Sequence, residues 1–311
     1  MFDVSVLIVT YNNEDDIGAC LDSVAAIAEY RVETVVVDND SSDATVEVTK
    51  AHPLAPHVIV AGDNAGFGAG MNTAAAAASG EYLLLLNPDA ILEPGSAERL
   101  VELARSRPDA SMVGGLTLRA NGEPNPDTVR RLPSLRGALM FASGMSMVSA
   151  RITDFERMPL PVTISAVPMI TGSLMVISAE RWRDLGGFDE RFFMYSEDTD
   201  ICARIGSHGW SILVDPEARI LHEGGASTPD GGRKAAMMMA GRATYMRVQW
   251  SGLRGQLGLA CLWWGALVRS LLSRVHPRAK RWGDVWRLRS WWFAGYGPDR
   301  PRLPPSPGSN G

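Results

Sequence analysis

The sequence has little cysteine: three residues among 311, Cys20, Cys202 and Cys261, lie far apart and lack the paired spacing of a disulfide framework or a zinc site. This excludes small disulfide-stabilised secreted classes and indicates reduced thiols in a reducing compartment. We also expect no secretory signal, because the first apolar run, residues 4–9, follows Asp3 rather than a basic residue, and a polar Tyr-Asn-Asn segment ends it early. We expect that run to be the first strand of a cytoplasmic protein.

Long apolar runs are absent as well. The longest uncharged stretch of the C-terminal part, residues 255–268, has 14 residues, which is short of the roughly 20 that a spanning helix needs. A transmembrane helix is therefore not expected here. The stretch either lies on a membrane surface or packs as an ordinary helix.

Acidic residues are scarce at the end of the chain. Residues 233–311 contain 14 of the 30 Lys and Arg but only two of the 35 Asp and Glu, a net charge of +12 against −17 for residues 1–232. Tryptophans interleave with this charge from residue 263 onward. Cations beside indoles fit an anionic membrane surface better than nucleic acid, the other partner that such charge attracts. We predict a helical membrane-associating extension at 233–299 and a disordered end at 300–311.

Strand and helix patterns alternate over the first 90 residues. This order predicts an α/β fold with a Rossmann-like, mostly parallel sheet flanked by helices, in a domain of residues 1–232. The leucine run at 83–86 is typical of a strand buried on both faces. The predicted strands are 4–9, 32–39, 58–62 and 82–87, and the predicted helices are 14–27, 43–52 and 71–79.

A polar cluster follows each of these four strands. One Asn-Pro-Asp segment is ordinary turn chemistry, but four clusters at four strand ends indicate a site. Because the carboxyl ends of parallel strands meet at one sheet edge, where open α/β sheets bind ligands, we expect the clusters to gather there. They are Thr10-Tyr11-Asn12, Asp38-Asn39-Asp40, Asp63-Asn64 and Asn87-Pro88-Asp89.

The third cluster opens a glycine-rich segment, NAGFGAGMN, at residues 64–72. Backbone amides at the start of the following helix could meet a phosphate. The segment is not the dinucleotide-binding motif, because its third glycine comes one place early and Met71 stands where that motif has glycine. A flexible turn before a helix is the alternative interpretation.

A second group of candidates lies between residues 171 and 227. Glu197, Asp198 and Asp200 stand within four positions at the start of a predicted helix. One acid can serve as a cap, whereas three together make it costly to ionise all of them, which can tune a carboxylate for general-base catalysis. His222 ends a strand-like segment, ARIL. A lone histidine is usually structural, but this one follows a strand as the acids do and could bind a metal.

Taken in order, these motifs resemble those of the family 2 glycosyltransferases, which have the GT-A fold and use nucleotide sugars. The resemblance covers roughly residues 3–228. Within the family, RRLPSLRG and FDERFFMYSEDTD are most similar to actinobacterial rhamnosyltransferases that act on lipid-linked N-acetylglucosamine in cell-wall synthesis. The motifs that carry the resemblance are VTYNN, VVVDNDSSD, NAGFGAGMN, LLLLNPDA, GGFDERFFMYSEDTDICARIGSHGW and HEGGAS.

The resemblance implies a donor site at the strand ends. Tyr11 and Asp38 would contact the nucleobase, and Asn64 with the loop after it the nucleotide. The implied donor-binding residues are Thr10, Tyr11, Asn12, Asp38, Asp40, Asn64, Gly66, Asn72, Asn87 and Asp89.

The resemblance also implies a metal site and a general base. Asp89 would bind the divalent metal that bridges the diphosphate, Mn²⁺ or Mg²⁺, and His222 would contact the metal or the diphosphate; as a ligand His222 favours manganese. Asp198 would be the base, with Glu197 beside it as a second catalytic candidate. We expect Asp89, His222 and Asp198 to converge on one cleft.

Two positions depart from the family pattern. Asn87 stands where the metal motif usually begins with Asp, so it offers a neutral carbonyl oxygen and should hold the metal more weakly before the nucleotide arrives. Asp40 stands where glycine is common, with no effect that the sequence alone explains.

The expected reaction is a single displacement that inverts the anomeric centre, because one base and no separate nucleophile are evident. The resemblance points to L-rhamnose moving from dTDP-rhamnose to polyprenyl-diphosphate N-acetylglucosamine, at the inner face of the cell membrane. A transferase using a UDP-sugar in exopolysaccharide or glycolipid synthesis and a non-catalytic nucleotide-sugar-binding scaffold are the alternatives. A nucleotidyltransferase is disfavoured, because residues 11–14 lack a Lys or Arg.

Overall fold

A computed structural model describes residues 2–145, 156–222, 231–273, 281–297 and 302–304. The chain forms two compact units. The first comprises Met1–Arg130, Met158–Asp189 and Ile201–Ser227, and the second comprises Arg131–Arg157, Glu190–Asp200 and Thr228–Gly311.

The first unit contains a nine-stranded sheet with the order β3-β2-β1-β4-β10-β6-β11-β5, and β8 pairs with β11. Strands β1 to β4 are mutually parallel, as their alternation with helices predicted. Antiparallel β10 lies between β4 and β6, and β11 runs parallel to β6. The strands are β1 (Val4–Thr10), β2 (Val32–Asp38), β3 (His57–Val60), β4 (Tyr82–Leu86), β5 (Ala90–Leu92), β6 (Ala110–Leu118), β8 (Ser165–Val167), β10 (Leu174–Ser178) and β11 (Ser211–His222). A separate pair joins β7 (Val129–Arg130) to β9 (Met169–Ile170).

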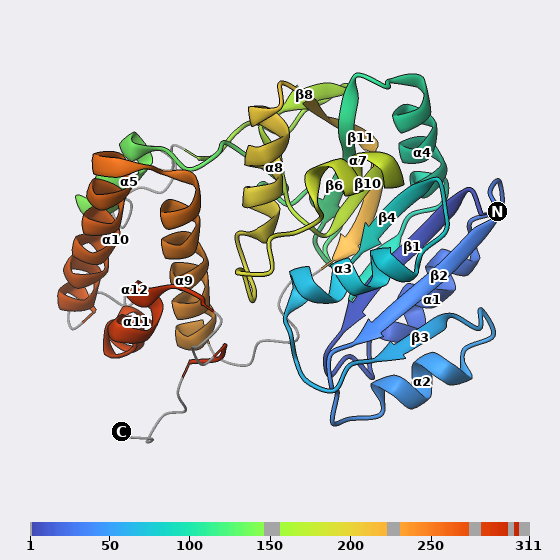
Figure 1. Ribbon diagram of the computed structural model, residues 1–311, viewed down its shortest axis with the longest axis horizontal. Coiled ribbons are helices and arrows are strands. Elements are labelled where there is room, and N and C mark those ends of the chain that lie inside the picture. The colour runs from blue at the N-terminus through green and yellow to red at the C-terminus, as the bar shows by residue number, and fades with distance from the viewer. Residues whose placement is uncertain (1, 146–155, 223–230, 274–280, 298–301, 305–311) are drawn as a thin grey trace. The chain divides into compact units, whose positions relative to one another are not determined.

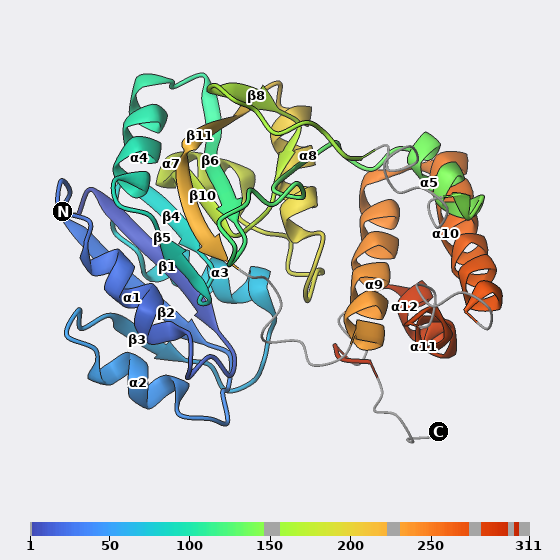
Figure 2. The same cartoon turned by 180° about the vertical axis from the view of Figure 1, so that it is seen from behind.

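Every residue of β1 and β4 is buried, as expected for strands covered by helices on both faces. Figures 1 and 2 show α1 on one face of the sheet and α3 on the other. On the α1 side the core joins Ile17 and Leu21 to Val6, Leu84 and Leu100. The helices of this unit are α1 (Ile17–Ala25), α2 (Thr45–Ala51), α3 (Phe67–Ala77), α4 (Ser96–Ser106) and α7 (Ala179–Leu185).

Helix α3 begins at Phe67, four residues before the predicted start, so residues 67–72 of the glycine-rich segment are helical. Gly70 is buried where α3 packs on β1, since a Cβ there would lie 2.8 Å from Cγ1 of Val9. Close packing against the sheet, which local pattern does not reveal, therefore decides where this helix starts.

The second unit is mainly helical. Helix α10 packs on α5, while α11 and α12 pack on α9. Trp292 is buried and donates its indole N–H to the carbonyl of Val285 at 2.7 Å. The helices are α5 (Leu135–Ala142), α9 (Gly231–Gln249), α10 (Gly252–Leu272), α11 (Arg281–Arg287) and α12 (Arg289–Ala294). Among the described helices, none is both long enough and apolar enough to cross a bilayer.

Helix α8 (Glu197–Ser207) belongs to both units: its first four residues are in the second and the rest in the first. The second unit also takes in residues 131–157 and 190–200, which precede the predicted extension at 233–299. Of the predicted disordered end, residues 300–311, all but 302–304 lie outside the described residues.

Candidate active site

The ends of β1 and β2 are joined by the carboxylate of Asp38. Thr10 Oγ1 donates to Asp38 Oδ2 at 2.8 Å, and Ser41 donates its backbone N–H to Oδ1 at 2.9 Å and its hydroxyl to Oδ2 at 2.5 Å. Asp38 is 1% exposed. A carboxylate accepts about four hydrogen bonds, so most of the capacity of Asp38 organises the loop itself.

Neighbouring side chains extend this junction. Asn12 Oδ1 accepts from the backbone N–H of Ser42 at 2.9 Å, and the N–H of Asn12 donates to Ser41 Oγ at 2.8 Å. Asn12 has φ 55° and Asp40 has φ 64°. Asn and Asp tolerate this left-handed region better than other non-glycine residues, which explains why Asp40 can stand where glycine is common. Tyr11 is half-buried and Asp40 is exposed.

Asn39 connects the end of β2 to the glycine-rich segment, a role that the sequence did not single out. Its Nδ2 donates to the carbonyl of Gly66 at 3.1 Å, while its buried Oδ1 has no hydrogen-bond partner within the described part of the chain. Gly66 has φ 94°, and its N–H donates to Asn64 Oδ1 at 3.0 Å. A buried acceptor without a donor is costly, so Asn39 joins the candidate donor-binding residues. Its position directly after Asp38 was the available sequence signal.

Asn72 is engaged within the first unit. Its Nδ2 donates to the carbonyl of Phe188 at 2.9 Å, and its Oδ1 accepts from the N–H of the same residue at 2.9 Å. Both ends of the amide thus hold the segment after α7 against α3. Donor binding by Asn72 stays a prediction.

Asn87, Asp89 and His222 come together, although 133 residues separate Asp89 from His222 in the sequence. His222 Nε2 lies 3.0 Å from Asp89 Oδ1 and 3.2 Å from Asn87 Nδ2. Asn87 and Asp89 lie in the turn between β4 and β5, and His222 is the last residue of β11, opposite Ala90 of β5. The side chains of Asp89 and His222 are 12% and 13% exposed. Residues 223–227, the rest of the HEGGAS motif, lie outside the described residues.

A β-bulge in β11 sets the register that places His222. Between Val214 and Arg219 the pairing with β6 shifts, so that residues 215–218 lie opposite Gly115 alone. A Cβ at Gly115 would be 2.3 Å from the carbonyl oxygen of Ala218, so a side chain there would clash with the bulge. Pro216, which cannot donate to the ladder, was the sequence signal for such an irregularity.

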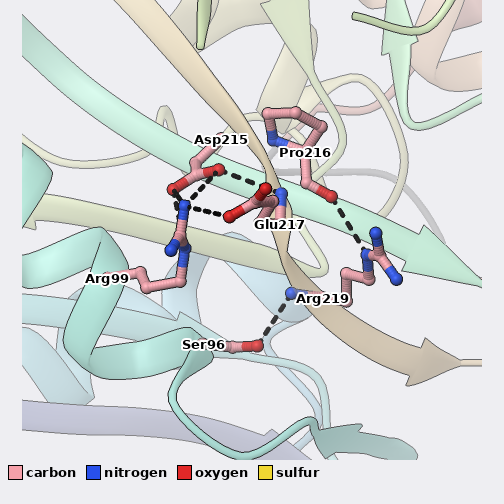
Figure 3. Close-up of polar contacts among 6 residues, drawn as sticks. All are labelled: Ser96, Arg99, Asp215, Pro216, Glu217 and Arg219. Carbon is pink, nitrogen blue, oxygen red and sulfur yellow. Dashed lines mark hydrogen bonds and ion pairs between the residues drawn. The ribbon is translucent and has the colours of Figure 1, made fainter. Parts of the chain in front are cut away.

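An ion-pair cluster fixes this bulge to α4 (Figure 3). Arg99 contacts Asp215 Oδ2 at 2.9 Å and Glu217 Oε2 at 2.8 Å, and Asp215 Oδ1 accepts from the N–H of Glu217 at 2.9 Å. Ser96 Oγ accepts from the N–H of Arg219 at 2.8 Å. The side chain of Asp215 is 4% exposed, so its charge depends on Arg99 for compensation.

The Asn87–Asp89–His222 group fits a divalent cation held jointly with a nucleotide. Asp89 Oδ1 and His222 Nε2 are 3.0 Å apart, about the separation of two adjacent ligands around an octahedral ion with bonds of roughly 2.1 Å. Within the described residues, no set of three His, Cys, Asp or Glu could hold an ion. A metal here would therefore take its remaining ligands from diphosphate oxygens and water, as Mg²⁺ sites commonly do.

In the second unit, the three acids at the start of α8 have different environments. Asp200 is fully buried and accepts from Gln249 Nε2 at 2.6 Å. Glu197 is 7% exposed, and its Oε2 has no hydrogen-bond partner among the described residues. Burial, with the nearby charge of Asp198, raises the pKa of Glu197 to about 8. Asp198 is half-buried and accepts from the N–H of Thr199 at 2.6 Å.

Asp198 is therefore the most exposed of the three. The two residues before the helix, Tyr195 and Ser196, have φ 66° and 76°. Such conformations are strained for non-glycine residues and concentrate at functional sites. The expectation that Asp198 faces the same cleft as Asp89 and His222 stays a prediction.

A mostly parallel sheet that places Asp38, Asn39, Asp89 and His222 at or just after the carboxyl ends of its strands has the arrangement in which open α/β proteins bind ligands. Residues 5–161 match the model of glycosyl transferase family 2. The chain belongs to glycosyl transferase family 2, and its fold is the GT-A fold.

Curated relatives cover most of the chain. It is 29% identical over 300 residues, 88% of this chain and 95% of the relative, to an N-acetylglucosaminyl-diphospho-decaprenol L-rhamnosyltransferase of Mycobacterium tuberculosis. It is 28% identical over 206 residues, 65% of this chain and 61% of the relative, to the low-salt glycan biosynthesis hexosyltransferase Agl10 of Haloferax volcanii.

Solved structures share the fold at low identity. The mannosyltransferase PcManGT of Pyrobaculum calidifontis, in complex with GDP-Man and Mn²⁺, superposes with a TM-score of 0.57 at 18% identity, over 93% of this chain and 81% of that one. TarS 1–349 of S. aureus, in complex with UDP, gives 0.51 at 16% identity, over 89% and 73%.

Proposed function

We propose that this glycosyltransferase is inverting and metal-dependent, and that it transfers L-rhamnose from dTDP-rhamnose to polyprenyl-diphosphate N-acetylglucosamine. The similarity to the mycobacterial L-rhamnosyltransferase supports the choice of sugar and acceptor, since it spans 88% of this chain and 95% of that relative. The observation that carries the chemistry is the approach of His222 to Asp89 at 3.0 Å, at the end of buried strand β4.

The strand-end residues bind the donor in this proposal. Tyr11 contacts the nucleobase, with Asp38 and Asn12 holding its loop, and Asn39 Oδ1 accepts from the bound nucleotide. Asn64 and Gly66 hold the loop before α3, so that the backbone amides at the start of α3 face the donor. Thr10, Asp40 and Asn72 complete the predicted donor-binding set.

Asp89 and His222 hold Mn²⁺ or Mg²⁺, with Asn87 contributing a neutral oxygen. When bound, the metal neutralises the negative charge that develops on the departing nucleoside diphosphate. The chain's own part is to keep the Asp89 carboxylate and the His222 imidazole together, which the pairing of β11 with β5 supports.

Asp198 is the general base in this proposal. It removes the proton from the attacking hydroxyl of N-acetylglucosamine, and a single displacement inverts the anomeric centre. The environment of Glu197 supports this assignment, because burial and the charge of Asp198 raise the pKa of Glu197, whereas Asp198 is the more exposed carboxylate of the pair. Glu197 thus contributes to the reaction through its effect on Asp198 and does not itself remove the proton.

A lipid-linked acceptor places the reaction at the membrane. We assign the protein to the cytoplasmic face of the cell membrane, held peripherally by its basic, tryptophan-rich helices. The net charge of +12 over residues 233–311 supports an anionic lipid surface as the partner.

The test combines donor binding with transfer. We expect dTDP-rhamnose with Mn²⁺ to raise the melting temperature more than UDP-sugars do, since a ligand that binds the folded state stabilises it. We also expect rhamnose transfer to a polyprenyl-diphosphate N-acetylglucosamine with inversion. Preference for a UDP-sugar would point to exopolysaccharide or glycolipid synthesis, a retained anomeric configuration would refute the mechanism, and binding without transfer to any acceptor would indicate a scaffold.

A further inference from the structure

Helix α10 has two opposite faces, one buried and one exposed. At about 100° per residue, the buried residues Gly255, Gly258, Leu262, Gly265, Ala266 and Arg269 fall on one side of the helix. This side packs inside the second unit: a Cβ at Gly258 would lie 2.4 Å from the Trp250 ring, and one at Gly265 would lie 2.4 Å from the Phe141 ring. The glycines on this side thus allow the neighbouring aromatic rings to approach the helix backbone.

The opposite side of α10 is exposed. Leu253, Leu257, Trp264 and Leu271 are 70%, 44%, 55% and 59% exposed. With Ala260 and Leu267 they recur at alternating spacings of four and three residues and fall within about 80° of arc. From residue 253 to residue 271 this side runs about 27 Å. We call these six residues the outer face of α10.

An exposed apolar stripe of this kind requires a partner. The spacing is also that of a coiled-coil seam, so a second copy of the helix is one conceivable occupant. The flanking positions of such a seam, which usually carry paired charges, here hold Arg254 as their sole charge, with Gln256, Cys261, Trp263, Val268 and Ser270. Two copies would therefore meet without compensating acids.

The charge around α10 favours an anionic surface instead. Residues 231–283 contain no Asp or Glu. Trp264, half exposed on the outer face, is a side chain typical of the membrane interface. A helix that is apolar on its outer face and has basic surroundings lies in the interface plane, with its apolar side among the acyl chains.

We propose that the outer face of α10 inserts into the headgroup–acyl boundary of an anionic bilayer. This inference rests on the proposed function in one respect, since it gives the surface through which the enzyme meets its lipid-linked acceptor. Insertion is parallel to the membrane and shallow, and salt weakens it because the net positive charge of residues 233–311 contributes electrostatic attraction.

Co-sedimentation with vesicles of phosphatidylglycerol and phosphatidylcholine tests the proposal on the full chain. We expect Leu257→Glu and Leu271→Glu each to weaken vesicle binding at least tenfold. Val162→Glu is the matched control, because Val162 is 91% exposed in the first unit and the substitution changes the net charge equally. Leu257→Gln, which keeps the net charge, should still weaken binding several-fold. Brominated lipids should quench fluorescence in the unaltered chain and less so in Trp264→Phe.

Equal vesicle binding by Leu257→Glu, Leu271→Glu and Val162→Glu would overturn the proposal. So would a dimer in light scattering that Leu257→Glu dissociates while vesicle binding persists, since the outer face would then join two copies. Circular dichroism and nucleotide binding confirm that each variant folds, and Leu257→Gln replaces Leu257→Glu if the latter does not.

A water-soluble, short-chain acceptor separates this inference from the proposed function. Leu257→Glu should transfer sugar to that acceptor at the rate of the unaltered chain while losing transfer to vesicle-bound acceptor. If no acceptor is glycosylated but vesicle binding still depends on Leu257 and Leu271, the proposed function is wrong, while the inference that the outer face of α10 binds the bilayer is upheld.

Discussion

The Nε2 atom of His222 lies 3.0 Å from Oδ1 of Asp89, and a second histidine–aspartate pair in the same unit has nearly the same geometry. In that pair, His52 Nε2 lies 3.1 Å from Asp22 Oδ1. The two pairs differ in their place on the fold, because Asp22 belongs to α1 and is 80% exposed, whereas Asp89 follows β4 and is 12% exposed. The second pair supplies an internal control for the first.

Removing the Asp89 carboxylate should abolish metal-assisted donor binding. We expect Asp89→Asn and His222→Ala to weaken Mn²⁺ binding in the presence of dTDP by about 100-fold or more, since loss even of an outer-shell partner costs about 10–100-fold. Calorimetric titration of Mn²⁺ into the nucleotide complex measures the change. Asp22→Asn should leave it unaltered, and an unchanged affinity in Asp89→Asn would rule out this metal site.

The ion pair between Arg99 and Asp215 should help to hold His222 in position, because it stabilises the bulge that sets the register of β11. Arg99→Gln leaves the buried Asp215 without its cation, so we expect a loss of about 1–3 kcal/mol in the free energy of unfolding. Because the bulge sets the register of β11, Mn²⁺ binding should weaken as well. Glu217→Gln is the control, since that side chain is 68% exposed and should cost less than about 1 kcal/mol. Urea unfolding and Mn²⁺ titration of both variants check this. Normal Mn²⁺ affinity in Arg99→Gln would show that the position of His222 does not depend on this ion pair.

Local pattern was enough to predict the four parallel strands β1 to β4 and the polar residues at their carboxyl ends. Buried runs such as residues 83–86 are a property of the strand itself, and the polar residues that follow each strand need only chain order to be placed. For the same reason the sequence could place Asp89 and His222 at the same edge, since each follows or ends a strand.

The features that the sequence did not predict depend on contacts between segments that are distant in the chain. The bulge at residues 215–218 depends on Arg99, more than 100 residues earlier in the chain. The start of α3 depends on packing against β1, and the different environments of Glu197 and Asp200 depend on burial and on Gln249. The left-handed φ of Asp40 becomes visible only in the folded loop.

Replacing the proposed base should separate catalysis from binding. We expect Asp198→Asn to lower kcat by about 10²–10⁴-fold, the usual contribution of a general base, while the Kd for dTDP-rhamnose changes little. Steady-state rates and donor titration provide the two readouts. Asp184→Asn, which removes an acid that pairs with Arg181 at 3.6 Å on α7, should leave both unchanged. A rate within a few-fold of the unaltered enzyme would exclude Asp198 as the base.

Glu197 should make the protein less stable as pH rises. Burial and the charge of Asp198 raise its pKa to about 8 in the folded protein, against about 4.3 for an unfolded chain. Between these values the folded state binds more protons than the unfolded state, so the contribution is fully present below about pH 4 and is lost as pH rises through 8. In Glu197→Gln this group no longer titrates, and the fall in stability from pH 5 to pH 8 should be smaller by a few degrees in Tm.

Melting curves at pH 5, 6, 7 and 8 measure the difference, with exposed Glu29→Gln as the control. Parallel curves for Glu197→Gln and the unaltered chain would mean that Glu197 ionises in the folded state as readily as in the unfolded one, and the choice of Asp198 over Glu197 as the base would lose this support.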